Sequence, residues 1–282
     1  MLNCVPLEDE LGDVLEKAMR RAGLNEEALG ARSRVSASSI LDAINYRSEL
    51  SGEELCRLAA TLGLNEIGLC ALGCGRYPLP KMAALPFSVY PLQMSHGIGV
   101  ANAYLIAEIG SDRGVLFDTG PGIEALKGRW PRSVRGVEAV FLTHMEAEHI
   151  GGLCETLDQF GAKVAYCPPG VVVRCGVSLS EGERRSFGTL RVTAFNTPGH
   201  ASAHNCYLVE SCRSNSVVGT ALLISGDLFF AGSVGSAQFC QAQLATHLRR
   251  MLQAVPPRTV IAPGHGPMTT AQNELSYNPF VV

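Results

Sequence analysis

The sequence has no apolar run long enough for a transmembrane helix, and no basic segment followed by an apolar one at its start. We therefore expect no membrane span and no signal peptide, and we place the protein in the cytoplasm. An excess of positive charge is also missing. The net charge of −3 at pH 7 argues against electrostatic capture of nucleic acid by the whole molecule.

Paired cysteine spacings are absent as well. The ten cysteines are scattered, and the closest pair, Cys70 and Cys74, fits no common zinc-ribbon spacing. Without an export signal, buried free thiols are expected rather than disulfides. What the chain does have is 282 residues, 46% hydrophobic and 17% charged, which suffice for one large or two modest globular domains.

Residues 1–76 are predicted to form a small helical domain. Apolar residues recur at helical spacing from 11 to 22, and further short helices are expected up to Leu62. Asn25 is predicted to cap the second helix, and Ser51 with Glu54 resembles a capping box. This succession resembles the helix-turn-helix domains of the phage-repressor (XRE) type, over roughly residues 8–75.

The resemblance implies that residues 36–45 form a recognition helix in the major groove of DNA. The candidate DNA contacts are Arg32, Arg34, Ser36, Ser38, Ser39 and Arg47. The serines offer no bidentate reading of a base, and residues 1–76 contain 8 basic and 12 acidic side chains. DNA binding and dimerisation both remain open as roles, and we expect a homodimer. Residues 77–87 are predicted to be a linker to a second domain at 88–282.

A loop with four potential metal ligands follows a predicted strand at residues 137–142. The four side chains are His144, Glu146, Glu148 and His149. A strand end is a rigid place for ligands, because the sheet fixes the backbone from which they project. Taken alone, these residues are explained equally well as a solvated polar loop.

Three later stretches repeat this design, each with a histidine or a carboxylate beside glycine after a predicted strand. The residues are His200 in Thr197-Pro198-Gly199-His200, Asp227 in Ser225-Gly226-Asp227, and His265 in Gly264-His265-Gly266. A carboxylate between two apolar strands is costly unless it is paired or bound to metal. Four such sites favour a shared metal centre over four unrelated structural residues. Strand pairs mixed with crossover helices favour layered sheets covered by helices.

Together with Asp118-Thr119-Gly120, these motifs resemble the metallo-β-lactamase superfamily over about residues 85–270, and their intervals are most similar to those of hydroxyacylglutathione hydrolases and persulfide dioxygenases. The resemblance implies an α+β fold, an αβ/βα sandwich with metal ions at one edge. It also implies the ligands: His144, Glu146 and His200 for one ion, Glu148, His149 and His265 for a second, and Asp227 as the bridge. Glu148 and Asp227 are in addition the catalytic candidates.

The chain departs from the superfamily's common His-x-His-x-Asp-His loop at Glu146 and Glu148. The added carboxylate makes the centre less positive, so that it acidifies bound water less and favours Fe or Mn over Zn. Glutathione thioesters are poor substrate candidates, because neither a Gly-Arg-x-Asp element nor a basic tail is present. His96 and His204 flank predicted strand ends and are candidate substrate contacts at the site mouth; ordinary surface histidines are the alternative interpretation.

Two function classes remain open. The first is a metal-dependent hydrolase of an ester, thioester or lactone, in which one or two divalent ions activate water against a small-molecule substrate. The second is a non-haem iron centre, either an oxygenase or a sensor of O₂, NO or redox state that acts on transcription through the helical domain. The hydrolase is preferred by analogy, because most chains of this superfamily hydrolyse a substrate.

Overall fold

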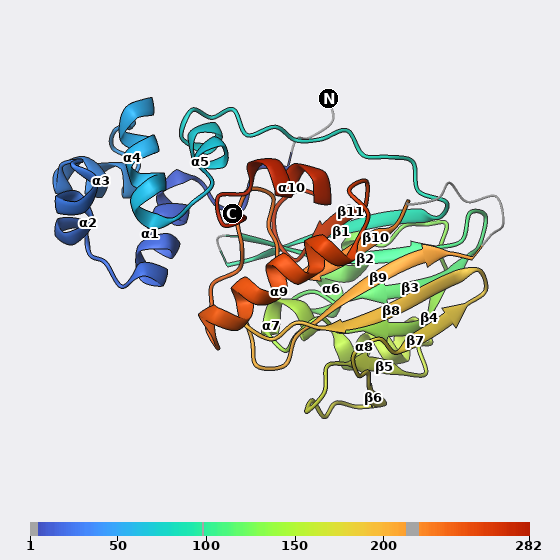
Figure 1. Cartoon of the computed structure of the whole chain (residues 1–282). Helices are drawn as coiled ribbons and strands as arrows, with labels where there is room; N and C mark the ends of the chain where they lie inside the picture. The colour runs from blue at the N-terminus through green and yellow to red at the C-terminus, as the bar shows by residue number, and fades with distance from the viewer. Residues whose placement is uncertain (1–4, 98, 213–219) are drawn as a thin grey trace.

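The computed structural model describes residues 5–97, 99–212 and 220–282 (Figure 1). Its first part is helical, with α1 (Leu11–Ala22), α2 (Glu26–Ser33), α3 (Ala37–Ile44), α4 (Gly52–Leu62) and α5 (Glu66–Gly73). The predicted caps are confirmed: Asn25 accepts a hydrogen bond from the backbone N–H of Ala28, and Ser51 and Glu54 form a capping box. No helix in these ranges is both long enough and apolar enough to span a bilayer.

Two six-stranded sheets follow. The first has the order β1 (Ser88–His96), β2 (Gly99–Ala107), β3 (Arg113–Phe117), β4 (Gly136–Phe141), β5 (Ala165–Cys167) and β6 (Gly176–Ser178). The second has the order β12 (Thr269–Thr270), β11 (Val260–Pro263), β10 (Leu222–Gly226), β9 (Asn205–Ser211), β8 (Leu190–Asn196) and β7 (Arg184–Phe187). Neighbouring strands from β3 to β6 run parallel, as do β10 and β11, and the remaining pairs are antiparallel.

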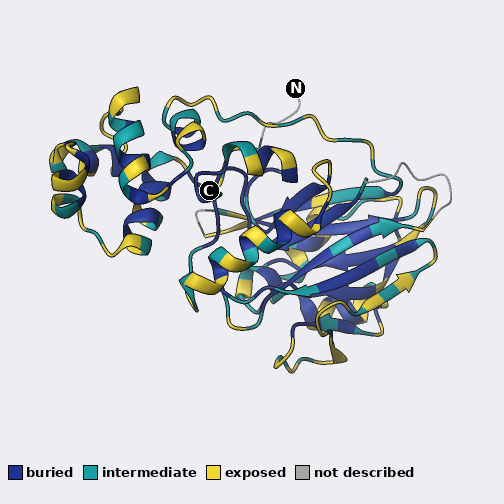
Figure 2. Ribbon diagram, in the orientation of Figure 1, coloured by how far each residue is buried: buried dark blue, intermediate teal, exposed yellow. Residues whose placement is uncertain are grey.

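Alternation of side chains along the strands separates the apolar residues into layers. Phe117 and Phe141 fill the space between the sheets, where their rings stack with centroids 5.0 Å apart. Leu116 points to the opposite face, which α6 (Ile123–Arg129) and α8 (Leu153–Gln159) cover. Leu223 packs beneath α9 (Gln241–Ala254) on the outer face of the second sheet. Figure 2 shows that the strands are largely buried and the helices partly exposed. The two sheets with helices on their outer faces confirm the predicted sandwich.

The helical part is joined to the sandwich by a continuous core. One cluster of buried side chains extends from Leu15 on α1 to Phe229, which lies shortly after β10 of the second sheet. At the start of α5, the backbone N–H of Asn65 donates to the carbonyl oxygen of Pro279 at 2.8 Å, close to the end of α10 (Ala271–Tyr277). The two parts therefore share packing as well as the connecting segment, which has neither helix nor strand between residues 76 and 87.

A fully buried carboxylate fixes the start of this connecting segment. Glu274 accepts hydrogen bonds from the Tyr77 hydroxyl, from Thr269 Oγ1 at 2.7 Å, from Asn278 Nδ2 at 2.8 Å and from the backbone N–H of Gly232 at 3.1 Å. Burial raises the pKa of Glu274, and these hydrogen bonds oppose that rise. The carboxylate thus ties the connecting segment and α10 to the loop that follows β10.

Replacing Glu274 with alanine leaves four donors without their acceptor. We expect Glu274→Ala to lower the free energy of unfolding by about 2–4 kcal/mol, measured by urea denaturation. Glu124→Ala is the matched control, because that carboxylate lies on α6 with 82% of its side chain exposed and should change stability little. Equal losses in the two variants would contradict the role given to Glu274.

Candidate metal centre

The predicted ligands meet where strands of both sheets end. His144 follows β4, His200 follows β8, Asp227 follows β10 and His265 follows β11. Since β10 and β11 are parallel and Gly226 pairs with Pro263, the turns that hold Asp227 and His265 lie side by side. Gly264 permits this approach, because a Cβ at that position would lie 2.1 Å from Asp227 Oδ1.

Two groups of donor atoms share Asp227. The first contains His144, Glu146, His200 and Asp227, and the second contains His149, Asp227 and His265. Asp227 Oδ1 lies 3.6 Å from His149 Nε2, and Oδ2 lies 3.7 Å from His200 Nε2 and 3.5 Å from His265 Nε2. Donors that bind one ion at about 2.0–2.2 Å are themselves separated by roughly 3–3.5 Å. The observed separations therefore suit ions held between these groups.

Hydrogen bonds fix the tautomers of two histidines. His200 Nδ1 donates to the carbonyl oxygen of Ser236 at 2.7 Å, and His265 Nδ1 donates to that of Val100 at 2.9 Å. A carbonyl oxygen can only accept, so the proton of each neutral ring lies on Nδ1. The Nε2 lone pairs consequently face Asp227, as in metal sites where a second hydrogen bond orients each ligand.

Asp118 orients the other two histidines. It accepts hydrogen bonds from the backbone N–H of Thr143 at 2.8 Å and from Thr143 Oγ1 at 2.7 Å, and its Oδ2 lies 3.4 Å from His149 Nδ1. Thr143 Oγ1 in turn accepts from His144 Nδ1 at 2.9 Å. Asp118 belongs to the Asp118-Thr119-Gly120 motif, the sequence signal from which this orienting role could have been assigned.

Several buried atoms of the centre have no hydrogen-bond partner within the described structure. They are His144 Nε2, His149 Nδ1 and Nε2, His200 Nε2 and Asp227 Oδ1. Unpaired polar atoms are rare in a protein interior, and all of these except His149 Nδ1, which faces Asp118, converge on the same place. Among the donors are imidazole nitrogens and carboxylate oxygens, which suit Zn, Fe or Mn. The residues present therefore fit one or two divalent ions.

The pKa shifts of His149 and Asp227 also indicate that positive charge is stabilised at this centre. Burial lowers the pKa of His149, but the Asp118 carboxylate beside Nδ1 and the charges of Asp227 and Glu148 outweigh burial and raise the value to about 9. Burial raises the pKa of Asp227, while the surrounding histidines, His149 first, lower it to about 2. The Asp227 carboxylate thus stays ionised, and the centre stabilises a cation beside it.

The structure places Glu148 outside both donor groups. Its Oε2 lies 3.9 Å from His96 Nε2, while 20% of the Glu148 side chain and 47% of the His96 side chain are exposed. His96 therefore lies at the edge of the site, where the sequence analysis placed it. Glu148 lines the cavity in front of the metal donors instead of closing the second group.

His204 is not at the site mouth, in contrast to the expectation from the sequence. It is 1% exposed, and its Nε2 accepts a hydrogen bond from the backbone N–H of Asp227 at 3.3 Å. Its Nδ1 lies 2.8 Å from Thr197 Oγ1, and burial lowers its pKa well below 6.5. His204 is therefore a neutral residue that positions the Asp227 turn from behind.

The sequence matches the family described as the metallo-beta-lactamase superfamily over residues 96–265. The chain belongs to this superfamily. It is 28% identical over 206 residues to "Probable metallo-hydrolase YqgX" of Bacillus subtilis (strain 168), covering 64% of this chain and 92% of the relative. It is 30% identical over 173 residues to "Hydroxyacylglutathione hydrolase" of Xylella fastidiosa (strain M12), covering 58% of this chain and 60% of that relative.

Solved structures agree on the fold. The metallo-beta-lactamase from Staphylococcus aureus subsp. aureus COL superposes with a TM-score of 0.57 at 17% identity, covering 68% of this chain and 62% of that one. BLEG-1 B3 metallo-beta-lactamase superposes with a TM-score of 0.54 at 25% identity, covering 67% of this chain and 98% of that one. In both comparisons about two thirds of this chain, the share expected for the sandwich, is covered.

Metal content distinguishes the two glutamates of the ligand loop. We expect Glu146→Ala to lose about one equivalent of metal, because it removes a donor from the first group. Glu148→Ala serves as the matched control, and we expect it to retain the metal content of the unmodified protein. Elemental analysis of protein purified without chelator measures both. Unchanged metal in Glu146→Ala, or a loss in Glu148→Ala, would reverse these assignments.

Proposed function

We propose that this protein is a metal-dependent hydrolase of an ester, thioester or lactone, with one or two divalent ions in the two donor groups. The observation that carries the proposal is the convergence of buried, unpaired histidine and carboxylate atoms on either side of Asp227. Relatives named metallo-hydrolase and hydroxyacylglutathione hydrolase support hydrolysis as the reaction class. A divalent ion bound there would lower the pKa of water and polarise a substrate carbonyl.

The residues divide into holding, orienting and proton-transfer roles. His144, Glu146, His200 and Asp227 would hold one ion, and His149, Asp227 and His265 would hold the other. Asp118 orients His149, and His204 supports the backbone of Asp227. Glu148 faces the cavity beside His96 and outside both donor groups, so we assign it the transfer of protons to or from the reacting groups.

An iron centre is the second candidate function. Glu146 Oε1 lies 3.1 Å from His200 Nε2, and Glu146 Oε2 lies 3.8 Å from His144 Nε2. Two histidines and one carboxylate form the donor set of many non-haem iron sites. This set favours an oxygenase, or a sensor of O₂, NO or redox state, as the alternative to hydrolysis.

Metal analysis and esterase assays together separate the two candidates. We expect protein purified without chelator to hydrolyse an activated ester or thioester, to lose that activity on chelation, and to regain it when Zn, Fe or Mn is added. Asp227→Asn should lower kcat/KM by at least about 100-fold, because both donor groups lose a ligand. Asp112→Asn is the control, since that side chain is 57% exposed. Bound iron with visible charge-transfer absorption and no hydrolysis would favour the second candidate.

For the helical part we propose DNA binding through phosphate contacts, with dimerisation as the alternative. The candidate side chains Arg32, Arg34, Ser36, Ser38 and Arg47 are exposed, and Ser39 is partly exposed. Ser36 Oγ lies 3.0 Å from Ser38 Oγ and 2.7 Å from Ser39 Oγ, so the serine hydroxyls already bond to one another. The arginines are then the groups left to contact phosphate.

A salt titration tests the DNA proposal. We expect Arg32→Ala/Arg34→Ala to weaken DNA binding at low salt and to reduce the salt slope by about 2, measured by fluorescence anisotropy. Arg258→Ala, which removes an exposed arginine from the sandwich, is the control. No DNA binding at low salt, together with a dimer in analytical ultracentrifugation, would instead assign the helical part to dimerisation.

A further inference from the structure

The helical part forms one wall of the cavity in front of the metal centre. This cavity of about 380 Å³ is lined on that side by Glu8, Asp9, Asp13, Glu16, Lys17 and Arg20. Glu146, Glu148, His200, Asp227 and His265 line its other side. The wall therefore comes from α1 and the segment before it, which lie outside the residues that match the superfamily.

Buried polar contacts hold this wall against the loop that follows Asp227. Lys17 Nζ pairs with Asp9 and donates to the carbonyl oxygen of Val234 at 2.8 Å. Asp9 also accepts a hydrogen bond from Ser233 Oγ. Glu8 extends the wall to the second donor group, where its Oε1 lies 3.9 Å from His265 Nδ1.

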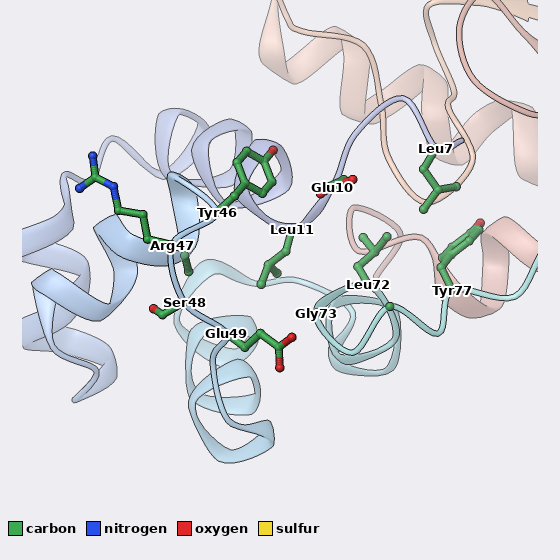
Figure 3. A pocket seen from close by; sticks show the side chains of 12 residues that line it. Leu7, Glu10, Leu11, Tyr46, Arg47, Ser48, Glu49, Leu72, Gly73 and Tyr77 are labelled. Atoms are coloured by element: carbon green, nitrogen blue, oxygen red, sulfur yellow. The ribbon is translucent and has the colours of Figure 1, made fainter. Parts of the chain in front are cut away.

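Two of the acidic groups on the wall are already matched by partners. Asp9 neutralises Lys17. Asp13 accepts hydrogen bonds from the Tyr46 hydroxyl at 2.6 Å and from the backbone N–H of Glu10 at 2.9 Å. Figure 3 shows Tyr46 and Glu10 around a neighbouring hollow of about 600 Å³ within the helical part. These contacts fix α1, while Glu16 and Arg20 of the same helix line the metal cavity.

Glu8 and Glu16 are the carboxylates of the wall that bond to neither Lys17 nor Tyr46. Glu16 is exposed and forms no hydrogen bond or ion pair with the part of the chain that the structure describes. Arg20 is the basic side chain of the wall that remains to oppose these two carboxylates, because Lys17 is paired. The field along this side of the cavity therefore attracts cations and repels anions.

A second cavity, lined largely by apolar and small side chains, adjoins the same metal donors. It has a volume of about 600 Å³ and shares Glu146, His200 and Gln238 with the first. The rest of its lining is Met145, Gly170, Val171, Val172, Ala201, Ser202, Ala203 and Phe239. Val172 is 95% exposed and Phe239 is 54% exposed, so apolar surface that an acyl chain could cover lies open beside the metal centre.

We propose that the substrate is an amphipathic ester or thioester with an apolar acyl chain and a positively charged leaving group, an inference that rests on the proposed hydrolase function. The acyl chain occupies the second cavity, beside Val172 and Phe239. The reacting carbonyl lies beside Glu146 and His200. The cationic group faces Glu8 and Glu16. Water supplies a hydroxyl to the acyl carbon and a proton to the leaving alcohol or thiol, so hydrolysis needs no further reactant.

Two isosteric esters test the charge preference. Octanoylcholine carries a trimethylammonium group, and 3,3-dimethylbutyl octanoate carries a neutral tert-butyl group of similar shape. We expect kcat/KM for the cationic ester to exceed that for the neutral ester by about 3- to 10-fold at low salt, and the ratio to fall as salt increases. Glu8→Gln/Glu16→Gln should bring the ratio close to unity. Glu27→Gln, an exposed change on α2 that lines neither cavity, should leave it unchanged.

A ratio at or below unity in the unmodified protein, or a ratio that the double variant does not alter, overturns the proposal. If neither ester is hydrolysed, the activated-ester and chelation assays above decide on the hydrolase function, and calorimetry decides on the cavity alone. Zinc-loaded protein should bind decyltrimethylammonium, below its micelle concentration, about 3- to 10-fold more tightly than the double variant does. Equal binding would show that Glu8 and Glu16 do not select cations.

Discussion

The carboxylate of Asp227 lies among histidine nitrogens in a place that water hardly reaches, with 6% of its side chain exposed. An ionised carboxylate at such a depth is costly unless a counter-charge offsets the loss of hydration. His200 and His265 cannot serve as hydrogen-bond donors to it while neutral, because their protons lie on Nδ1 and are engaged by carbonyl oxygens. A divalent cation between these donors would supply the counter-charge that the buried carboxylate needs. Much of the surrounding structure, including Gly264 and the buried His204, serves to keep that carboxylate in place.

The same turn explains why the helical part and the metal centre are mechanically linked. Ser233 and Val234, which follow Asp227 closely in the chain, bond to Asp9 and Lys17 of the helical part. One residue earlier in this loop, the backbone N–H of Gly232 donates to Glu274, and Glu274 also binds the connecting segment. A shift of α1 must therefore break these bonds or move the loop. This arrangement gives either function class a physical route between the helices and the metal centre.

The sequence could indicate which side chains converge at this edge, because most of them follow an apolar strand within a few residues. It did not predict how Glu148 points, because α7 (Ala147–Ile150) turns His149 inward and leaves the preceding residue on the cavity side. The burial of His204 depends on the packing of the start of β9 under the Asp227 turn. The wall formed by α1 depends on contacts such as Lys17 with Val234, which are 217 positions apart and leave no local pattern.

The metal donors bear on the class of reaction, whereas the charge of the cavity bears on the choice of leaving group. The sandwich supplies the donor groups, and that part of the chain resembles proteins named hydroxyacylglutathione hydrolase. The acidic wall comes from residues 8–20, before the family match begins at residue 96. A glutathione leaving group carries a net negative charge, so Glu8 and Glu16 would repel it across a cavity of about 380 Å³. A wall of this sign beside the metal donors would therefore select against an anionic leaving group, because like-charge contact disfavours one substrate without altering the donors.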